Sequence, residues 1–135
     1  MSFWERLFRG SRTEHEEAAR PALDGPEHRA PQKLSGRSAE DFLRGHRSVV
    51  VDLWAAWYQP CRAFAPVVDR AAAEFAGRVA FGKVNVDRDP SLARLWKVRS
   101  VPTLLFFRDG KVVGRVTGPC SPASLDARIR RAFGL

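Results

Sequence analysis

Apolar and polar positions follow two different periodicities between residues 32 and 133. Short apolar runs rich in β-branched and aromatic residues predict strands, and apolar residues that recur every three or four positions predict helices. The expected strands are Ser48–Trp54, Val79–Val86, Thr103–Phe107 and Lys111–Val116, to which Gln32–Leu34 could add a short edge strand. The expected helices are Ser38–Gly45, Pro60–Ala76, Pro90–Trp96 and Pro122–Phe133.

The order of these elements predicts an α/β fold. Helices that connect successive strands in the first half of the chain imply parallel pairing there. Asp109 and Gly110 form a two-residue turn signal between the last two strands, which must then pair antiparallel. We therefore expect a central mixed β-sheet with helices on both faces. A chain of 135 residues has room for one such domain and an extension.

The first 29 residues differ from the rest of the chain. Four large apolar residues recur at helical spacing within residues 1–9 and predict a short amphipathic segment: Phe3, Trp4, Leu7 and Phe8. Residues 10–29 are polar and rich in Pro, Glu and Arg, which predicts a flexible linker before a domain at 30–135. The segment could be a frayed tail, dock on its own domain, or attach weakly to a membrane or partner.

Composition and charge exclude several classes of function. Two cysteines and three histidines are too few for a disulfide scaffold or a Cys-based zinc site, so we expect no metal and no cofactor. The net charge of +8 comes from scattered basic residues without an RNA-binding aromatic motif, which argues against specific nucleic-acid binding. No apolar run approaches the ~20 residues of a membrane span, and no leader pattern begins the chain. A cytoplasmic monomer is the expectation.

Residues 49–62 carry the candidate chemistry. They read Val-Val-Val-Asp-Leu-Trp-Ala-Ala-Trp-Tyr-Gln-Pro-Cys-Arg, and this stretch resembles the active-site region of thioredoxins. Further stretches agree in order and spacing: Lys83-Val-Asn-Val-Asp87, Val98-Arg-Ser-Val101-Pro102, Asp109-Gly-Lys and Gly118. The resemblance implies a thioredoxin fold over roughly residues 30–135 and a cis peptide bond before Pro102.

The same stretch departs from the thioredoxin pattern at two positions. Thioredoxins use Trp-Cys-Gly-Pro-Cys, in which the first thiolate attacks a disulfide and the second cysteine resolves the mixed disulfide. Here Tyr58 and Gln59 replace the first cysteine and the glycine, while Trp57, Pro60 and Cys61 remain. A phenol cannot form a disulfide, so this motif cannot run the ordinary dithiol cycle.

Three residues determine whether any thiol chemistry remains. A position in the first helical turn beside Arg62 favours the Cys61 thiolate, whereas burial opposes it, so Cys61 is either an inert buried residue or a monothiol. The resemblance gives Asp52 the role of proton acceptor for Cys61; alternatively, Asp52 is an inherited acid without a catalytic role. Cys120, near Gly118, could supply a partner thiol or remain unpaired.

The resemblance also implies a surface that binds extended peptides. Its residues would be Trp57, Val101, Pro102, Thr117 and Gly118, enlarged by Tyr58, Gln59 and Pro60. The simpler interpretation is that Trp57 is packed and that Tyr58 fills space. We expect a module that binds protein or peptide partners, with at most monothiol chemistry at Cys61. The competing hypothesis is an atypical thiol-disulfide oxidoreductase that uses Cys61 alone or with Cys120.

Overall fold

The computed structural model describes residues 29–135, so the expectations for residues 1–28 lie outside the described part of the chain. Strands and helices alternate along the described chain until two consecutive strands, β4 and β5, precede the last helix. The strands are β1 (Gln32–Lys33), β2 (Ser48–Trp54), β3 (Ala80–Asn85), β4 (Thr103–Arg108) and β5 (Lys111–Thr117). The helices are α3 (Gly36–Gly45), α4 (Gln59–Glu74), α5 (Pro90–Leu95) and α6 (Pro122–Phe133).

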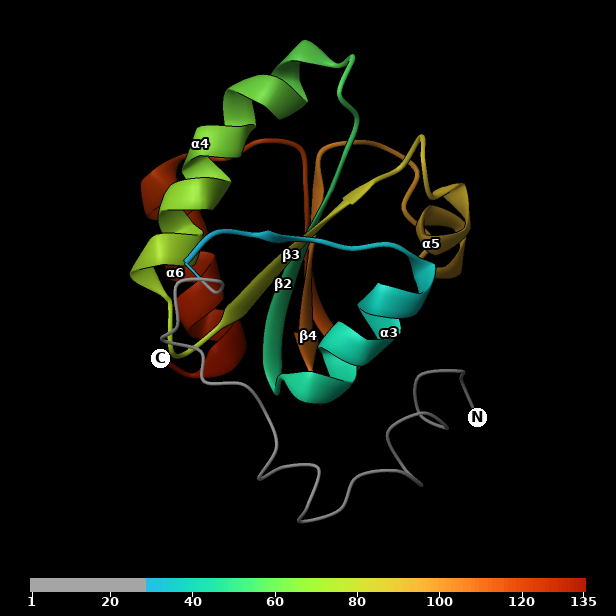
Figure 1. Ribbon diagram of the computed structural model, residues 1–135. Helices are drawn as coiled ribbons and strands as arrows, with labels where there is room; N and C mark the ends of the chain where they lie inside the picture. The colour runs from blue at the N-terminus through green and yellow to red at the C-terminus, as the bar shows by residue number, and fades with distance from the viewer. Residues whose placement is uncertain (1–28) are drawn as a thin grey trace.

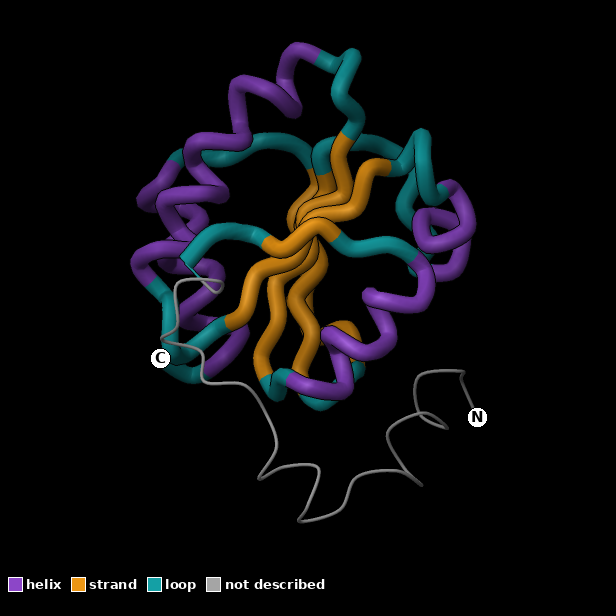
Figure 2. Tube along the Cα trace, viewed as in Figure 1, coloured by secondary structure: helices purple, strands orange, loops and turns teal. Residues whose placement is uncertain are grey.

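The five strands form one mixed sheet in the order β1-β3-β2-β4-β5. Strands β1, β3 and β2 are parallel, and β4 pairs antiparallel with both β2 and β5. Figures 1 and 2 show the sheet nearly edge-on, with α4 and α6 on one face and α3 and α5 on the other. The predicted α/β class and the mixed sheet with helices on both faces are confirmed.

Both faces of the central strand are buried, which explains the nearly continuous apolar run of β2. Val50 belongs to the core cluster that includes residues of α4 and α6, whereas Val49 and Val51 belong to the cluster on the α3 side. Asp52 interrupts this run and is itself buried. Because side chains alternate along a strand, Asp52 shares the α4 face with Val50.

The turn between β4 and β5 forms as the sequence indicated. Asp109 and Gly110 have φ angles of 51° and 80°, the left-handed region that a two-residue turn between twisted strands requires at both positions. The turn brings the last two strands into antiparallel register, with Arg108 opposite Lys111.

Helix α3 begins earlier than its sequence pattern indicated. The prediction placed the helix start at Ser38, but the helix begins at Gly36 with Ser35 as its N-cap. The Ser38 hydroxyl oxygen accepts the Ser35 N–H at 2.8 Å, a capping-box contact that satisfies an amide at the helix start. Within residues 29–135, no helix is both long and apolar enough to span a bilayer.

Candidate functional site

A tight turn after β2 positions the thiol of Cys61. The Tyr58 N–H donates to the Ala55 carbonyl oxygen at 3.3 Å, and the Tyr58 carbonyl oxygen accepts the Cys61 N–H at 3.0 Å. Tyr58 is the N-cap of α4, and Pro60 in the first turn has no N–H to leave unsatisfied. Cys61 therefore lies in the first turn of α4, at the carboxyl end of β2.

Burial governs the chemistry of this thiol. Cys61 is 3% exposed. Burial raises the pKa of Cys61, a hydrogen bond with the Ala55 backbone lowers it, and the negative charge of Asp52 raises it. Arg62, expected from the sequence to favour the thiolate, instead donates from Nη1 to the Ala56 carbonyl oxygen at 3.1 Å. The thiol is accordingly protonated and shielded at neutral pH.

Asp52 lies close enough to Cys61 for the two groups to interact electrostatically. Its Oδ1 is buried and has no hydrogen-bond partner in the described part of the chain. Burial raises the pKa of Asp52 to about 7, the ammonium of Lys83 lowers it, and the carboxylate of Asp69 on α4 raises it. Lys83 is the register partner of Asp52 on β3. A negative charge on Asp52 thus disfavours ionisation of Cys61.

The aromatic residues of the turn point into solvent. Trp57 is 68% exposed and Tyr58 is 38% exposed, and their ring centroids lie 5.5 Å apart at an interplanar angle of 58°. Gln59 is exposed as well, and Pro60 is half-buried. Trp57 is therefore not packed into the domain, contrary to the simpler interpretation of its role.

Trp57 and Tyr58 form one wall of a groove of about 380 Å³. The remaining lining residues come from the segments after β3 and before β4: Val86, Ala93, Val98, Arg99, Ser100 and Val101. Most of these side chains are apolar, and the Arg99 guanidinium supplies the one formal charge among the residues that line the groove. The groove brings Trp57 and Val101 together, although they lie 44 positions apart in the sequence.

Two loops meet beside this groove. The Val101–Pro102 peptide bond is cis. The Gly118 N–H donates to the Pro102 carbonyl oxygen at 2.8 Å, which joins the loop before β4 to the loop after β5. Gly118 has a φ of 87°, a conformation that a glycine adopts without strain. In Figure 1 the β2–α4 turn and both loops lie at the same end of the sheet.

Cys120 has different surroundings from Cys61. It is half-buried in the loop before α6 and packs against the core cluster of α4 and α6. Burial raises its pKa, while the Arg128 guanidinium and a hydrogen bond with Ser124 lower it. Both cysteines are free thiols in the structure, so the hypothetical Cys61–Cys120 pair is not formed.

Sequence reasoning placed Val101 at the binding surface but missed the rest of the far wall of the groove and the positive charge of Lys83 near Asp52. Val86, Ala93 and Val98 resemble ordinary core positions in the sequence, and none of them was assigned to a surface. Lys83 could have been found, because parallel pairing of the two predicted strands brings the middle of one beside the middle of the other. In residues 29–135, no three His, Cys, Asp or Glu side chains cluster in a way that could hold a metal ion.

The fold and site define a thioredoxin-fold domain with a thiol in the first turn of α4 and a cis-proline loop beside it. The thioredoxin family model matches residues 32–131, and the chain belongs to the thioredoxin family. The resemblance recognised in residues 49–62 is thereby confirmed at the level of the family.

Named relatives agree with this assignment. A thioredoxin from Synechocystis sp. is 37% identical over 101 residues, which are 75% of this chain and 94% of that protein. A chloroplastic M-type thioredoxin from Pisum sativum is 40% identical over 101 residues, but these cover 59% of its length. A solved structure of a variant thioredoxin from Halobacterium salinarum superposes with a TM-score of 0.74 at 31% identity, covering 80% of this chain and 95% of that one.

Proposed function

We propose that this chain is a thioredoxin-like domain that binds protein or peptide segments without running a dithiol cycle. Binding takes place at the motif surface, which comprises Trp57, Tyr58, Gln59, Pro60, Val101, Pro102, Thr117 and Gly118. One observation carries the proposal: the aromatic pair of the motif is exposed beside an apolar groove, while the thiol of the same motif is 3% exposed.

The groove suits an apolar side chain of a bound segment. Adjacent exposed apolar side chains that form a patch often mark interaction sites, and Trp and Tyr are enriched among residues that dominate binding energy. Trp57 and Tyr58 would cover an aliphatic or aromatic side chain inserted against Val86 and Val98. Arg99 would attract an acidic residue next to the inserted side chain.

Covalent chemistry at this surface is limited by a single buried thiol. The Cys61 thiolate could attack a partner disulfide, forming a mixed disulfide and releasing the other partner sulfur as a thiolate. The motif has no second cysteine to resolve that bond, because Tyr58 occupies the place where the family pattern has one. Burial and a raised pKa both reduce the thiolate available for the first step.

An atypical thiol-disulfide oxidoreductase is the second candidate. Membership of the thioredoxin family supports it, as does Asp52, a buried carboxyl group that interacts electrostatically with Cys61 and has a pKa of about 7. A carboxylate with that pKa can accept a proton near neutral pH. This candidate requires Cys61 to react, alone or with Cys120, whereas the binding function does not.

Peptide selection tests the binding function directly. A random peptide library would be selected on the full chain, and the affinity of enriched peptides would be measured by fluorescence anisotropy. We expect Trp57→Ala and Tyr58→Ala each to weaken binding by about tenfold or more. Cys61→Ser should leave the affinity unchanged.

Val112→Ala is the matched control, because Val112 is 46% exposed on β5 and belongs to neither the groove nor the motif surface. Equal affinity of the wild type, Trp57→Ala and Tyr58→Ala for every enriched peptide would overturn the proposed surface. Binding that disappears in Cys61→Ser would favour the oxidoreductase instead.

A further inference from the structure

A second hollow, of about 550 Å³, lies at the carboxyl ends of the three parallel strands. Its lining residues lie near the carboxyl ends of β1, β2 and β3 or just after them: Lys33, Leu34, Ser35, Trp54, Ala56, Lys83, Asn85, Arg88 and Asp89. Ligands of open α/β sheets commonly bind outside the carboxyl ends of parallel strands. Small-molecule sites usually measure about 300–1,000 Å³, so this hollow is large enough for a ligand.

Positive charge collects in this hollow. Lys33, Lys83 and Arg88 line it, against the single carboxylate of Asp89, whose Oδ1 accepts the Ser91 hydroxyl at 2.9 Å. Lys33 and Lys83 are register partners on neighbouring strands, so these two positively charged residues occupy adjacent positions in the sheet. Such a pair is unfavourable unless an anion separates the charges.

Few negatively charged groups balance the charges of Lys33, Lys83 and Arg88. Among the described side chains, none of the three forms an ion pair with a carboxylate. Asp52 interacts electrostatically with Lys83 from β2, but the pKa of Asp52 is about 7, so it is only partly ionised at neutral pH. The positive charge of the hollow is therefore left largely unbalanced.

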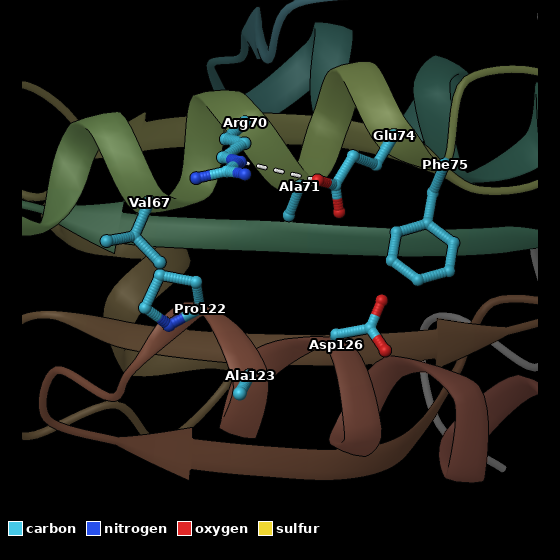
Figure 3. Close-up of a pocket in the computed structure, with 8 residues that line it drawn as sticks. All are labelled: Val67, Arg70, Ala71, Glu74, Phe75, Pro122, Ala123 and Asp126. Carbon is cyan, nitrogen blue, oxygen red and sulfur yellow. Dashed lines mark hydrogen bonds and ion pairs between the residues drawn. The ribbon is translucent and has the colours of Figure 1, made fainter.

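The hollow between α4 and α6 shows the opposite arrangement (Figure 3). It measures about 300 Å³, and its charged side chains already have partners. Arg70 Nε lies 3.3 Å from Glu74 Oε1, and Asp126 Oδ2 accepts Arg130 Nε at 2.9 Å. Excess positive charge is thus a property of the hollow at the strand ends and not of every hollow in this basic protein.

The side chain of one of these cations and the backbone of another are held by their surroundings. Lys83 Nζ lies 5.8 Å from the centroid of the Trp54 ring, within reach of a cation–π interaction. The backbone of Arg88 closes a turn in which Asn85 Oδ1 accepts the Asp87 N–H at 2.9 Å and the Asn85 carbonyl oxygen accepts the Arg88 N–H at 3.1 Å. A ligand would find these positions partly organised before it binds.

We propose that this hollow binds a small dianion of the phosphate or sulfate type, either free or as the phosphoryl group of a larger molecule. Lys33, Lys83 and Arg88 supply the charge-assisted hydrogen bonds. The site shares no residue with the motif surface, so it is independent of the proposed peptide binding.

The test is an NMR titration of the full, ¹⁵N-labelled chain with sodium sulfate, whose charge is constant between pH 6 and 8, against sodium chloride at equal ionic strength. We expect saturable shifts at the Trp54 indole and at amides of residues 83–89 with sulfate only. Lys33→Gln and Arg88→Gln should each weaken sulfate binding by about tenfold. Arg131→Gln, an exposed cation on α6 outside the hollow, should leave it unchanged.

Lys33 and Arg88 are exposed, so both variants should keep the dispersed amide spectrum of the fold. A second titration with phenyl phosphate distinguishes the two sources of the anion: tighter binding than sulfate indicates an organic phosphate, and equal binding indicates a free oxyanion. Shifts that stay linear in sulfate, or that are the same in Lys33→Gln, Arg88→Gln and the wild type, would overturn the proposal.

Discussion

Trp57 and Cys61 are four residues apart and have opposite environments. Trp57 is 68% exposed beside an apolar groove, and Cys61 is 3% exposed under the same turn. Contact with a partner requires only shape and apolar area, whereas thiol chemistry requires an accessible thiolate. The contrast shows that the exposed aromatic surface and the thiol have physically separate environments, so the proposed binding does not require a reactive thiol.

The buried side of the site also disfavours negative charge. Asp52 and Cys61 are two buried acids, burial raises the pKa of both, and the negative charge of Asp52 further opposes ionisation of Cys61. Lys83 is the one positive group found to act on this pair, and its effect on Asp52 is smaller than that of burial.

Restoring the missing thiol should produce the largest change. In a Tyr58→Cys, Gln59→Gly double variant, an exposed thiol stands at the N-cap of α4 and can attack a disulfide, and Cys61 can resolve the product. We expect insulin reduction with dithiothreitol to rise at least about a thousandfold over the wild-type protein. Turbidity of precipitating insulin measures the rate.

A Tyr58→Ala, Gln59→Gly variant is the matched control, since it opens the same space without adding a thiol, and it should stay at background. If the variant with the added cysteine were also inactive while correctly folded, more than the nucleophile would be missing from this site.

Removing the buried charge should give the next largest change. The folded pKa of Asp52 is about 7 against an ordinary value of 3.8, so its ionisation costs about 4 kcal/mol of stability once complete. That cost is absent below about pH 4, grows between pH 4 and 7 as the unfolded state loses its proton first, and is complete above pH 7. Asp52→Asn should therefore be more stable than the wild type by up to about 4 kcal/mol at pH 8, and equal to it at pH 4.

Urea unfolding at both pH values measures this difference. Asp69→Asn on α4, an exposed position, should change the stability at pH 8 far less. An Asp52→Asn protein with the same stability gain at pH 4 as at pH 8 would show that charge burial is not the cause.

Alkylation measures how accessible the Cys61 thiol is in the folded protein. In a Cys120→Ser background, iodoacetamide should modify Cys61 in the native protein roughly a hundredfold more slowly than in urea, because reaction requires local opening and a thiolate. Mass spectrometry of timed samples gives both rates. Native labelling as fast as that of the unfolded chain would mean that the thiol is as available to partners as Trp57.

The smallest expected effect concerns the charges around Asp52. Lys83→Gln should raise the pKa of Asp52 above about 7, because it removes the positive charge that lowers it. Asp69→Asn should lower that pKa, because it removes a negative charge. Carboxyl ¹³C titration measures both, and shifts of the same sign in the two variants would contradict the electrostatic account.

Local signals in the sequence predicted most of the fold. Pro60, Pro90 and the Asp109-Gly110 turn mark element boundaries through backbone geometry, which depends on neighbouring residues alone. The start of α3 was wrong because the capping pair is Ser35 with Ser38, and Ser38 lies inside the helix instead of before it.

The site was less predictable because its properties depend on packing. From the sequence, the helix dipole and Arg62 are expected to favour the Cys61 thiolate and burial to oppose it. In the packed structure Arg62 donates to the Ala56 carbonyl oxygen, and burial has the largest effect on the pKa of Cys61. Val86 and Val98 line the groove beside Trp57, and although both lie in stretches that match the thioredoxin pattern, nothing in the sequence places them next to Trp57. The exposure of Trp57 depends on the geometry of the turn between β2 and α4 and on how much of that turn the rest of the domain covers.

The rate of insulin disulfide reduction by the wild-type chain tests the central claim most directly. With dithiothreitol as reductant, the wild type and Cys61→Ser should both match the rate without protein, because Tyr58 supplies no nucleophile and Cys61 is buried. A wild-type rate above that background, abolished by Cys61→Ser, would contradict the account and assign the oxidoreductase function to this chain.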